Sequence, residues 1–340
     1  MPCTTGYGIV HLHPTLRCNL RCRHCYSASS PGAKGGLSSA RILPYLDYLL
    51  REHGYRVLSV SGGEPFLYRE LPELLAAAHD LGYHNQLVSN GMLLKSRRAQ
   101  RALDHTDSLA ISIDGDRELH NALRDSPDAY DRTLEGLAVL RDRGANFGLI
   151  HTLTKRSWRQ LPALIRLARN YGAGLLQLHT LEAAGRAVTG VDPDLYLDQD
   201  DLHRVFLLVT IIRRTNPGLQ LQLDLIHRDY LEQHPEAVRA GPRLPCTMRE
   251  LSRELIITET GDVLPIAYGF DARFRIDNIH ELNYLGGDPV GDYLRLRGRD
   301  LHTLVRDLLE EVTNGPDELI NWSERLIHAA GAPHRISYST

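Results

Sequence analysis

The chain has 340 residues, of which 42% are hydrophobic and 24% are charged, and its formal net charge at pH 7 is -3. A balance this close to neutrality argues against a nucleic-acid partner held by a basic face. The longest apolar run, residues 205–212, is shorter than a bilayer span of roughly 20 residues, so we expect no membrane-spanning helix. The N-terminus lacks a basic stretch followed by an apolar one, so we expect no secretory signal and a cytoplasmic protein.

Short β-branched runs alternate with amphipathic helical stretches over the first 180 residues. This alternation favours an α/β fold with right-handed crossovers between parallel strands. Six strands suit a partial barrel as well as an open sheet, and periodicity alone does not separate the two. The expected strands cover residues 9–13, 56–60, 84–88, 108–113, 146–153 and 175–179, and the expected helices cover 39–53, 69–81, 95–103, 128–143 and 157–171.

The pattern changes after residue 190, where an acidic stretch indicates a linker or loop. A helix near 201–215, a strand near 219–225 and a hairpin over 255–265 are expected next, with the hairpin turning at 260–262. The last 50 residues have the leucine spacing of helices. We therefore expect one domain over 1–190 and a smaller α+β domain over 191–340.

Three of the five cysteines lie in one array, Cys18-Asn-Leu-Arg-Cys22-Arg-His-Cys25, directly after the first expected strand. An ordinary buried thiol cluster would serve no packing purpose. Structural zinc takes four protein ligands, normally as two separated pairs, and His11, His13 or His24 would have to supply the fourth. A cubane iron–sulfur cluster with three cysteine ligands leaves one iron open to bind a small molecule, which is a catalytic arrangement.

The array resembles the CxxxCxxC signature of the radical S-adenosylmethionine (radical SAM) enzymes, with His24 in the aromatic position before the last cysteine. Four further motifs fall where that family places them, after the second, third, fourth and sixth expected strands, and the resemblance covers roughly residues 9–190. These motifs are Ser61-Gly62-Gly63-Glu64-Pro65, Ser89-Asn90-Gly91, Ser112-Ile-Asp114-Gly115 with His120 and Arg124, and Gly185-Arg186-Ala187.

The resemblance implies a partial (β/α)6 barrel that holds one [4Fe-4S] cluster and S-adenosylmethionine (SAM). An external electron donor of the flavodoxin or ferredoxin type would drive cleavage of SAM to a 5′-deoxyadenosyl radical, which abstracts a hydrogen atom from the substrate. Cys18, Cys22 and Cys25 would be the cluster ligands. The implied SAM contacts are His24, Gly62, Gly63, Glu64, Asn90, Ser112, Asp114 and Arg124.

Elementary chemistry agrees with these assignments. Ligands of parallel α/β folds bind at the carboxyl ends of the strands, where the motifs lie. Gly62 and Gly63 allow the backbone to approach a ligand closely because they lack a Cβ. Glu64 offers a carboxylate to an ammonium group, and Ser112 or Asn90 can form hydrogen bonds with a carboxylate or a ribose hydroxyl.

The C-terminal region resembles the SPASM or twitch extension that binds auxiliary iron–sulfur clusters in many peptide-modifying relatives. Cys246 is followed after 14 residues by Gly261, but Ile266 stands where the second cysteine belongs. Only Cys3 and Cys246 remain as further thiols, so we expect a degenerate extension and a single cluster. Cys246 is then either a small buried residue or the donor of a hydrogen atom to a substrate radical, as in an epimerase. Candidate substrate contacts are His151, His179 and Tyr268.

Three functions remain open from the sequence. The first is epimerisation or crosslinking of a ribosomally made peptide; only 17 residues precede Cys18, so we expect a separate leader-peptide-binding protein to present that peptide. The second is the same radical chemistry on a small-molecule natural product, such as a sugar, nucleoside or aminoglycoside. The third is a protein that binds iron–sulfur or zinc without catalysis.

Overall fold

The structure is a computed structural model, and it describes residues 7–331, so Cys3 lies outside the described residues. Its fold is mixed α/β, as expected. The six expected strands are all present, and their ends differ from the expectation by at most one residue. They are β1 (Gly8–Leu12), β2 (Tyr55–Val60), β3 (His84–Ser89), β4 (Ser108–Ser112), β5 (Phe147–Leu153) and β6 (Leu175–Thr180).

The expected helices follow these strands. Leu71, Leu74, Leu75 and Ala78 of α2 form the apolar stripe that the spacing predicts, and all four are fully buried. The helix expected from residue 157 begins later because Trp158–Gln160 form a 3₁₀ turn. The helices are α1 (Ser39–His53), α2 (Leu71–Leu81), α3 (Arg97–Leu103), α4 (Arg117–Arg124), which was not expected, α5 (Ala129–Arg143) and α6 (Leu161–Tyr171).

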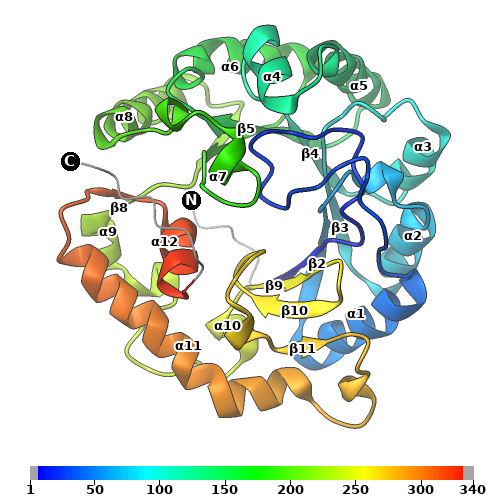
Figure 1. Cartoon of the computed structure of the whole chain (residues 1–340), viewed down its shortest axis with the longest axis vertical. Helices are drawn as coiled ribbons and strands as arrows, with labels where there is room; N and C mark the ends of the chain where they lie inside the picture. Colours follow the sequence, from blue (N-terminus) through cyan, green and yellow to red (C-terminus); the bar gives the residue numbers. More distant parts are fainter. Residues whose placement is uncertain (1–6, 332–340) are drawn as a thin grey trace.

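The strands form one curved sheet in the order β11-β10-β9-β1-β2-β3-β4-β5-β6-β7. All neighbours from β9 to β7 run parallel, whereas β10 and β11 are antiparallel additions at one edge. Figure 1 shows α1 to α6 in an outer arc around the strands, which is consistent with a partial barrel. The four strands of this sheet that follow β6 in the chain are β7 (Gln220–Leu223), β9 (Glu254–Ile257), β10 (Asp262–Pro265) and β11 (Asp277–Asn278).

The C-terminal region joins both edges of the barrel sheet. The expected hairpin is confirmed as β9 and β10. Strand β9 also pairs in parallel with β1, in a register that places His11 opposite Ile256. The sheet therefore crosses the boundary expected at residue 190, and the division into two domains stays a prediction. The remaining elements are α7 (Ala187–Gly190), α8 (Gln199–Thr215), α9 (Arg228–Gln233), α10 (Met248–Leu251), α11 (Pro289–Thr313), α12 (Trp322–Ala329), and a two-stranded sheet of β8 (Ile226–His227) and β12 (Leu319–Ile320).

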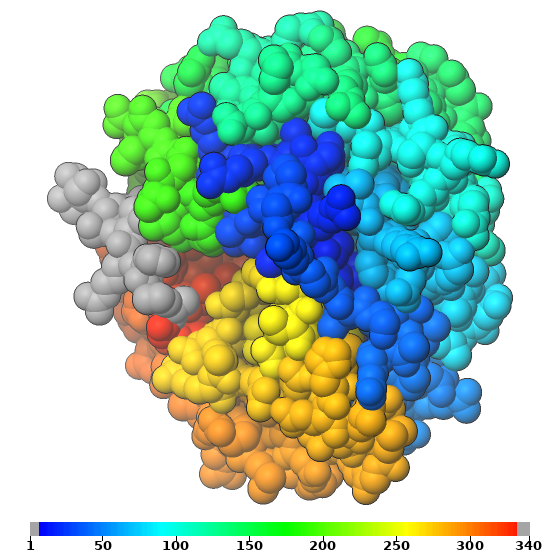
Figure 2. Space-filling view, turned by 45° about the vertical axis from the view of Figure 1, so that its right-hand side comes forward, coloured from blue at the N-terminus to red at the C-terminus, as the bar shows by residue number. Residues whose placement is uncertain are grey.

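The loop between β1 and α1, residues 13–38, carries the three-cysteine array and is called the cysteine loop below. Figure 2 shows its dark blue residues at the surface, bordered by the green segment around α7 and the yellow segment of β9 and β10. Within residues 7–331, no helix has the length and apolar character needed to cross a bilayer.

Candidate active site

A cavity of about 330 Å³ lies at the carboxyl ends of the parallel strands. It receives residues from the cysteine loop and from the ends of β2, β3, β4, β5 and β6, as expected for a ligand site in a parallel α/β fold. Its lining includes Cys18, Leu20, Cys22, His24, Cys25, Tyr26, Ser61, Gly62, Gly63, Glu64, Ser89, Asn90, Ser112, Arg124, Ile150, Thr152, His179, Thr180, Leu181 and Glu182.

Backbone contacts hold the cysteine loop in place. The guanidinium of Arg186 donates hydrogen bonds to the carbonyls of Cys22 (2.7 Å) and Ala28 (3.1 Å), so one side chain closes the loop from outside. Gly185 lies so near the loop that a Cβ there would sit 2.1 Å from the carbonyl oxygen of Tyr26. The Gly-Arg-Ala motif after β6 therefore supports the loop that carries the cysteines.

The three cysteines are free thiols that line the same cavity. Burial raises the pKa of Cys18 to about 12 and that of Cys22 to about 11, although Arg124 partly opposes the rise at Cys22. Thiols in such surroundings remain protonated until a metal centre displaces their protons. Binding of a metal centre by Cys18 and Cys22 would therefore release protons.

The donor set fits an iron–sulfur cluster better than zinc. Among residues 7–331, no group of three or more His, Cys, Asp or Glu side chains is arranged around a single metal ion. A cubane cluster needs no such convergence because each cysteine binds a different iron. The three histidines considered for zinc have other contacts: His11 pairs with Glu254, His13 stacks on Tyr268, and His24 contacts Asp114.

Gly62 and Gly63 line the cavity, but their missing side chains are required chiefly by the cysteine loop. A Cβ on Gly63 would lie 2.2 Å from the carbonyl oxygen of Arg17, and Gly62 has φ +95° with the Thr15 carbonyl oxygen 2.8 Å from its Cβ position. The sequence predicted that these glycines leave space for a ligand. In the structure they also leave space for the backbone of the cysteine loop.

Glu64 is almost completely buried at the end of β2. Its Oε1 accepts a hydrogen bond from the hydroxyl of Ser89 (2.9 Å), and its Oε2 accepts one from the backbone N–H of Asn90 (3.0 Å). Burial raises the pKa of Glu64 to about 7, against the lowering effect of these hydrogen bonds. A bound cation would favour its charged form, so the carboxylate suits an ammonium ligand.

Asp114 does not line the cavity but holds two residues that do. Its Oδ2 accepts from Nε of Arg124 at 2.7 Å and lies 3.4 Å from Nε2 of His24. Burial alone would raise the pKa of Asp114, but Arg124 and His24 outweigh it and hold that pKa well below the usual range. The structure thus corrects the expected SAM contact at Asp114 to a supporting position behind Arg124 and His24.

Asn90 connects the cysteine loop to β3. Its Nδ2 donates to Oδ1 of Asn19 at 2.9 Å and lies 4.0 Å from the sulfur of Cys18. Ser112, at the end of β4, lines the cavity as expected. Both residues therefore reach the site that the sequence predicted for them.

One wall of the cavity carries polar groups that the sequence indicated only in part. His179 was a candidate, and its Nδ1 is in close contact with Oδ2 of Asp224 beyond β7. Glu182 follows β6, three residues before the Gly185-Arg186-Ala187 motif, and was not expected. Thr152 at the end of β5 was also missed, because a threonine in a strand carries no functional signal of its own.

Two of the candidate substrate contacts do not line the cavity. His151 is fully buried, with Nδ1 2.8 Å from the Ile113 carbonyl and Nε2 3.0 Å from the Ser157 hydroxyl, so it is a structural residue. Tyr268 lies behind the lining residue Tyr26, against which it packs edge-on with ring centroids 5.6 Å apart.

Cys246 is exposed on the segment before α10. The strand that follows α10 is β9, and its first residue, Glu254, pairs with Ile9 near the amino end of β1. It is absent from the cavity lining. The exposed thiol contradicts the expectation of a small buried residue, and the hydrogen-donor role stays a prediction. The resemblance of this region to a SPASM or twitch extension stays a prediction.

Residues 12–168 match the family described as the radical SAM superfamily. Fe-coproporphyrin III synthase from Methanosarcina barkeri is 32% identical over 193 residues, which cover 56% of this chain and 48% of that protein. Pre-heme d1 synthase from Dinoroseobacter shibae is 35% identical over 186 residues, covering 54% and 45%. The antilisterial bacteriocin subtilosin biosynthesis protein AlbA of Bacillus subtilis is 23% identical, covering 61% and 45%.

This chain therefore spans about half the length of these curated relatives. Among solved structures, Streptococcus suis SuiB bound to its precursor peptide SuiA matches with a TM-score of 0.67 at 17% identity, over 88% of this chain and 66% of that one. SuiB bound to S-adenosylmethionine matches with a TM-score of 0.65 at 18% identity, over 85% and 68%. At these identities the likeness shows the fold.

Proposed function

Because residues 12–168 match the radical SAM superfamily, we propose that this chain is a radical SAM enzyme that cleaves SAM reductively and abstracts a hydrogen atom from its substrate. The observation that best supports this proposal is a shared cavity, lined by Cys18, Cys22 and Cys25 together with Glu64 and Arg124. Cys18, Cys22 and Cys25 would hold a [4Fe-4S] cluster, which would supply the electron transfer for reductive cleavage of SAM bound in the same cavity.

The chain's own residues bind and orient these groups. Glu64 receives the ammonium group of SAM, and the hydrogen bonds from Ser89 and Asn90 fix the direction of its carboxylate. Arg124, held by Asp114, places a positive charge beside the cysteines. Gly62, Gly63, His24 and Ser112 complete the walls on the SAM side, and the cavity limits access of water to a reactive radical.

For the substrate we propose a ribosomally made peptide, modified by epimerisation or crosslinking. The likeness to SuiB, whose structure is described as bound to a precursor peptide, extends over 88% of this chain and includes C-terminal elements. The name of AlbA also refers to biosynthesis of a bacteriocin. A separate leader-peptide-binding protein and a flavodoxin or ferredoxin that delivers electrons are the proposed partners.

A small-molecule substrate is the second candidate, and the names of two relatives favour it. Fe-coproporphyrin III synthase and pre-heme d1 synthase are named for tetrapyrroles, and they share 32% and 35% identity with this chain. Those matches cover only 56% and 54% of the chain, so they leave nearly half of it unmatched. We therefore rank this candidate second.

The decisive experiment is anaerobic purification followed by reconstitution with iron and sulfide. Incubation with SAM and dithionite is expected to yield 5′-deoxyadenosine and methionine, detected by liquid chromatography and mass spectrometry. A protein that fills with zinc, or that holds a cluster but never yields 5′-deoxyadenosine, would show that the enzyme assignment is wrong.

The substrate class is tested separately, on active enzyme. Short peptides encoded beside this gene are incubated with enzyme, SAM and reductant, and the product is examined for a mass change or, after hydrolysis, for D-amino acids. Candidate tetrapyrroles and amino sugars form the comparison arm. Turnover of a tetrapyrrole or sugar, with no change in any peptide, would favour the second candidate over the first.

A further inference from the structure

One wall of the cavity, at the end of β6, carries titratable side chains. We call His179, Glu182 and Asp224 the β6 wall. His179 and Glu182 line the same cavity as the cysteines, and Asp224 supports His179 from the segment after β7. None of the three belongs to the motifs at the cysteine side of the cavity.

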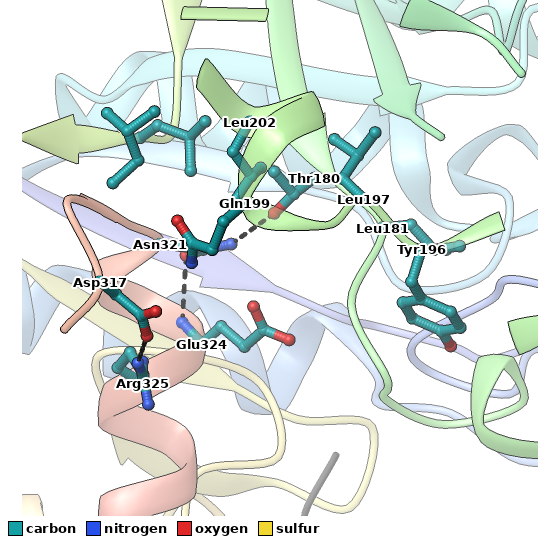
Figure 3. A pocket seen from close by; sticks show the side chains of 12 residues that line it. Thr180, Leu181, Tyr196, Leu197, Gln199, Leu202, Asp317, Asn321, Glu324 and Arg325 are labelled. Carbon is teal, nitrogen blue, oxygen red and sulfur yellow. Dashed lines mark hydrogen bonds and ion pairs between the residues drawn. The ribbon is translucent and has the colours of Figure 1, made fainter. Parts of the chain in front are cut away.

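Glu182 is positioned by a residue from the far end of the chain. Asn321, the N-cap of α12, donates from Nδ2 to Oε1 of Glu182 (3.0 Å) and to the Thr180 hydroxyl (2.8 Å). Its Oδ1 accepts from the backbone N–H of Glu324 at 3.2 Å, which fixes the amide orientation. Figure 3 shows Asn321 between Thr180 and α12, in a small cavity that adjoins the main one through Thr180 and Leu181.

The charges of the β6 wall do not cancel. His179 Nδ1 is in close contact with Oδ2 of Asp224, which raises the pKa of His179 although burial alone would lower it. The charged groups acting on Glu182 are this same His179 and Asp224, and burial raises the pKa of Glu182. Within residues 7–331, Glu182 forms a hydrogen bond with the neutral amide of Asn321 and no ion pair, so its charged form is penalised by burial. A cationic ligand would remove that penalty.

Other basic groups at the cavity are already engaged. Arg124 pairs with Asp114, and His24 also contacts Asp114. The ammonium group of SAM has a separate partner in the proposed function, Glu64, which lies on the segment after β2. The β6 wall is therefore available to the second molecule that the reaction requires.

We propose that the β6 wall is the substrate subsite and that it binds a primary ammonium group, with Glu182 as its acceptor and Asn321 as the positioning residue. This inference rests on the proposed function for its statement that a substrate enters this cavity. The ammonium belongs either to a lysine side chain of a peptide or to an amino sugar. Anionic tetrapyrroles, with their carboxylates, are disfavoured by the same negative charge.

The test is a binding measurement on the reconstituted, SAM-loaded protein under anaerobic conditions. Isothermal titration uses Nα-acetyl-lysine methylamide as the peptide probe and methyl glucosaminide as the sugar probe, each alongside its N-acetylated, uncharged counterpart. We expect one amine to bind and its neutral counterpart to bind at least about tenfold more weakly, as for a lost charge-assisted hydrogen bond. The amine that binds identifies the source of the ammonium group.

Three variants locate the binding site. Glu182→Gln keeps the shape and removes the charge, and it should raise the Kd of the amine about tenfold or more, well beyond any change in the Kd of SAM. Asn321→Ser keeps a side chain able to cap α12 but cannot reach Glu182, so a smaller rise is expected. Glu236→Gln is the matched control, because Glu236 also contacts a histidine (3.2 Å from His234) yet lies outside the cavity.

Each outcome decides the proposal. Equal affinity for amine and neutral probe, no binding of either amine, or an unchanged Kd in Glu182→Gln overturns it. An equal loss of SAM and amine affinity in Glu182→Gln would assign the wall to SAM instead. Because binding needs no turnover, the result stands apart from the proposed function, which fails on its own if the wild type produces no 5′-deoxyadenosine.

Discussion

The two sides of the cavity are built in different ways. The cysteine side comes from segments at the ends of neighbouring strands, and backbone groups connect them: Asn90 N–H to Glu64, and Gly63 against the Arg17 carbonyl. The β6 wall depends on side chains from three distant segments, Glu182 with His179, Asp224 and Asn321. Backbone-defined geometry tolerates little change, whereas a wall made of side chains can be altered one residue at a time. The first arrangement suits chemistry shared by a family, and the second suits the choice of substrate.

The largest effect is expected on the cysteine side. Cys22→Ala removes one of three cluster ligands, so iron content and 5′-deoxyadenosine formation should both fall to background after reconstitution. Iron is measured by colorimetric assay and the cluster by its visible absorption. Full activity in this variant would mean that the array is not the cluster site.

The buried ion pair behind the cysteine side should dominate stability. Asp114→Asn leaves Arg124 buried without its partner, which is expected to cost about 3–5 kcal/mol in the free energy of urea unfolding. The matched control is Asp131→Asn, which breaks an exposed pair with Arg117 and should cost about 0–1 kcal/mol. Similar losses in the two variants would contradict the role given to the buried pair.

A smaller effect is expected where the loop packs on backbone. Gly63→Ala places a Cβ against the Arg17 carbonyl and should destabilise the protein by about 1–3 kcal/mol while lowering cluster incorporation. Gly218→Ala, which meets no atom within 4 Å, is the control and should leave both properties near wild type. Thermal unfolding and iron content report the two properties. Normal cluster incorporation in Gly63→Ala would show that the loop adapts.

On the β6 wall the expected effect depends on pH. Asp224 raises the pKa of His179, so their pairing stabilises the fold fully below the ordinary value of 6.5 and is lost as the pH rises through the raised value. The free energy of unfolding should therefore differ more between wild type and Asp224→Asn at pH 6 than at pH 9. Nuclear magnetic resonance of the His179 ring checks the cause: its midpoint should lie above 6.5 in wild type and fall in the variant.

The smallest effect is expected outside both walls. Cys246 is exposed and absent from the cavity, so Cys246→Ala should leave 5′-deoxyadenosine formation and product configuration unchanged, with stability within about 0.5 kcal/mol of wild type. Loss of an inverted product in this variant would support the hydrogen-donor role.

The sequence predicted the cysteine side well because its residues lie at strand ends, and strand ends follow from hydrophobic periodicity. Helix α4 was missed since its eight residues are mostly polar, although Asp116 caps it by accepting from the backbone N–H of Leu119 (3.0 Å). The hairpin was predicted, but its pairing with β1 was not, because the hydrophobic pattern of a strand does not indicate which strand lies beside it. Likewise no local pattern connects Asn321 to Glu182, which lies 139 residues away in the chain.

The pairing of β9 with β1 has a consequence for how the protein is made. The two strands are about 240 residues apart, so β1 keeps one unpaired edge until the ribosome has delivered the β9 segment. At roughly 5–20 residues per second, that interval is roughly 12–48 s. An exposed apolar edge is open to wrong pairing during this time. The cysteine loop leaves this strand directly, so the strand that carries the loop gains its second neighbour only after the β9 segment has been made.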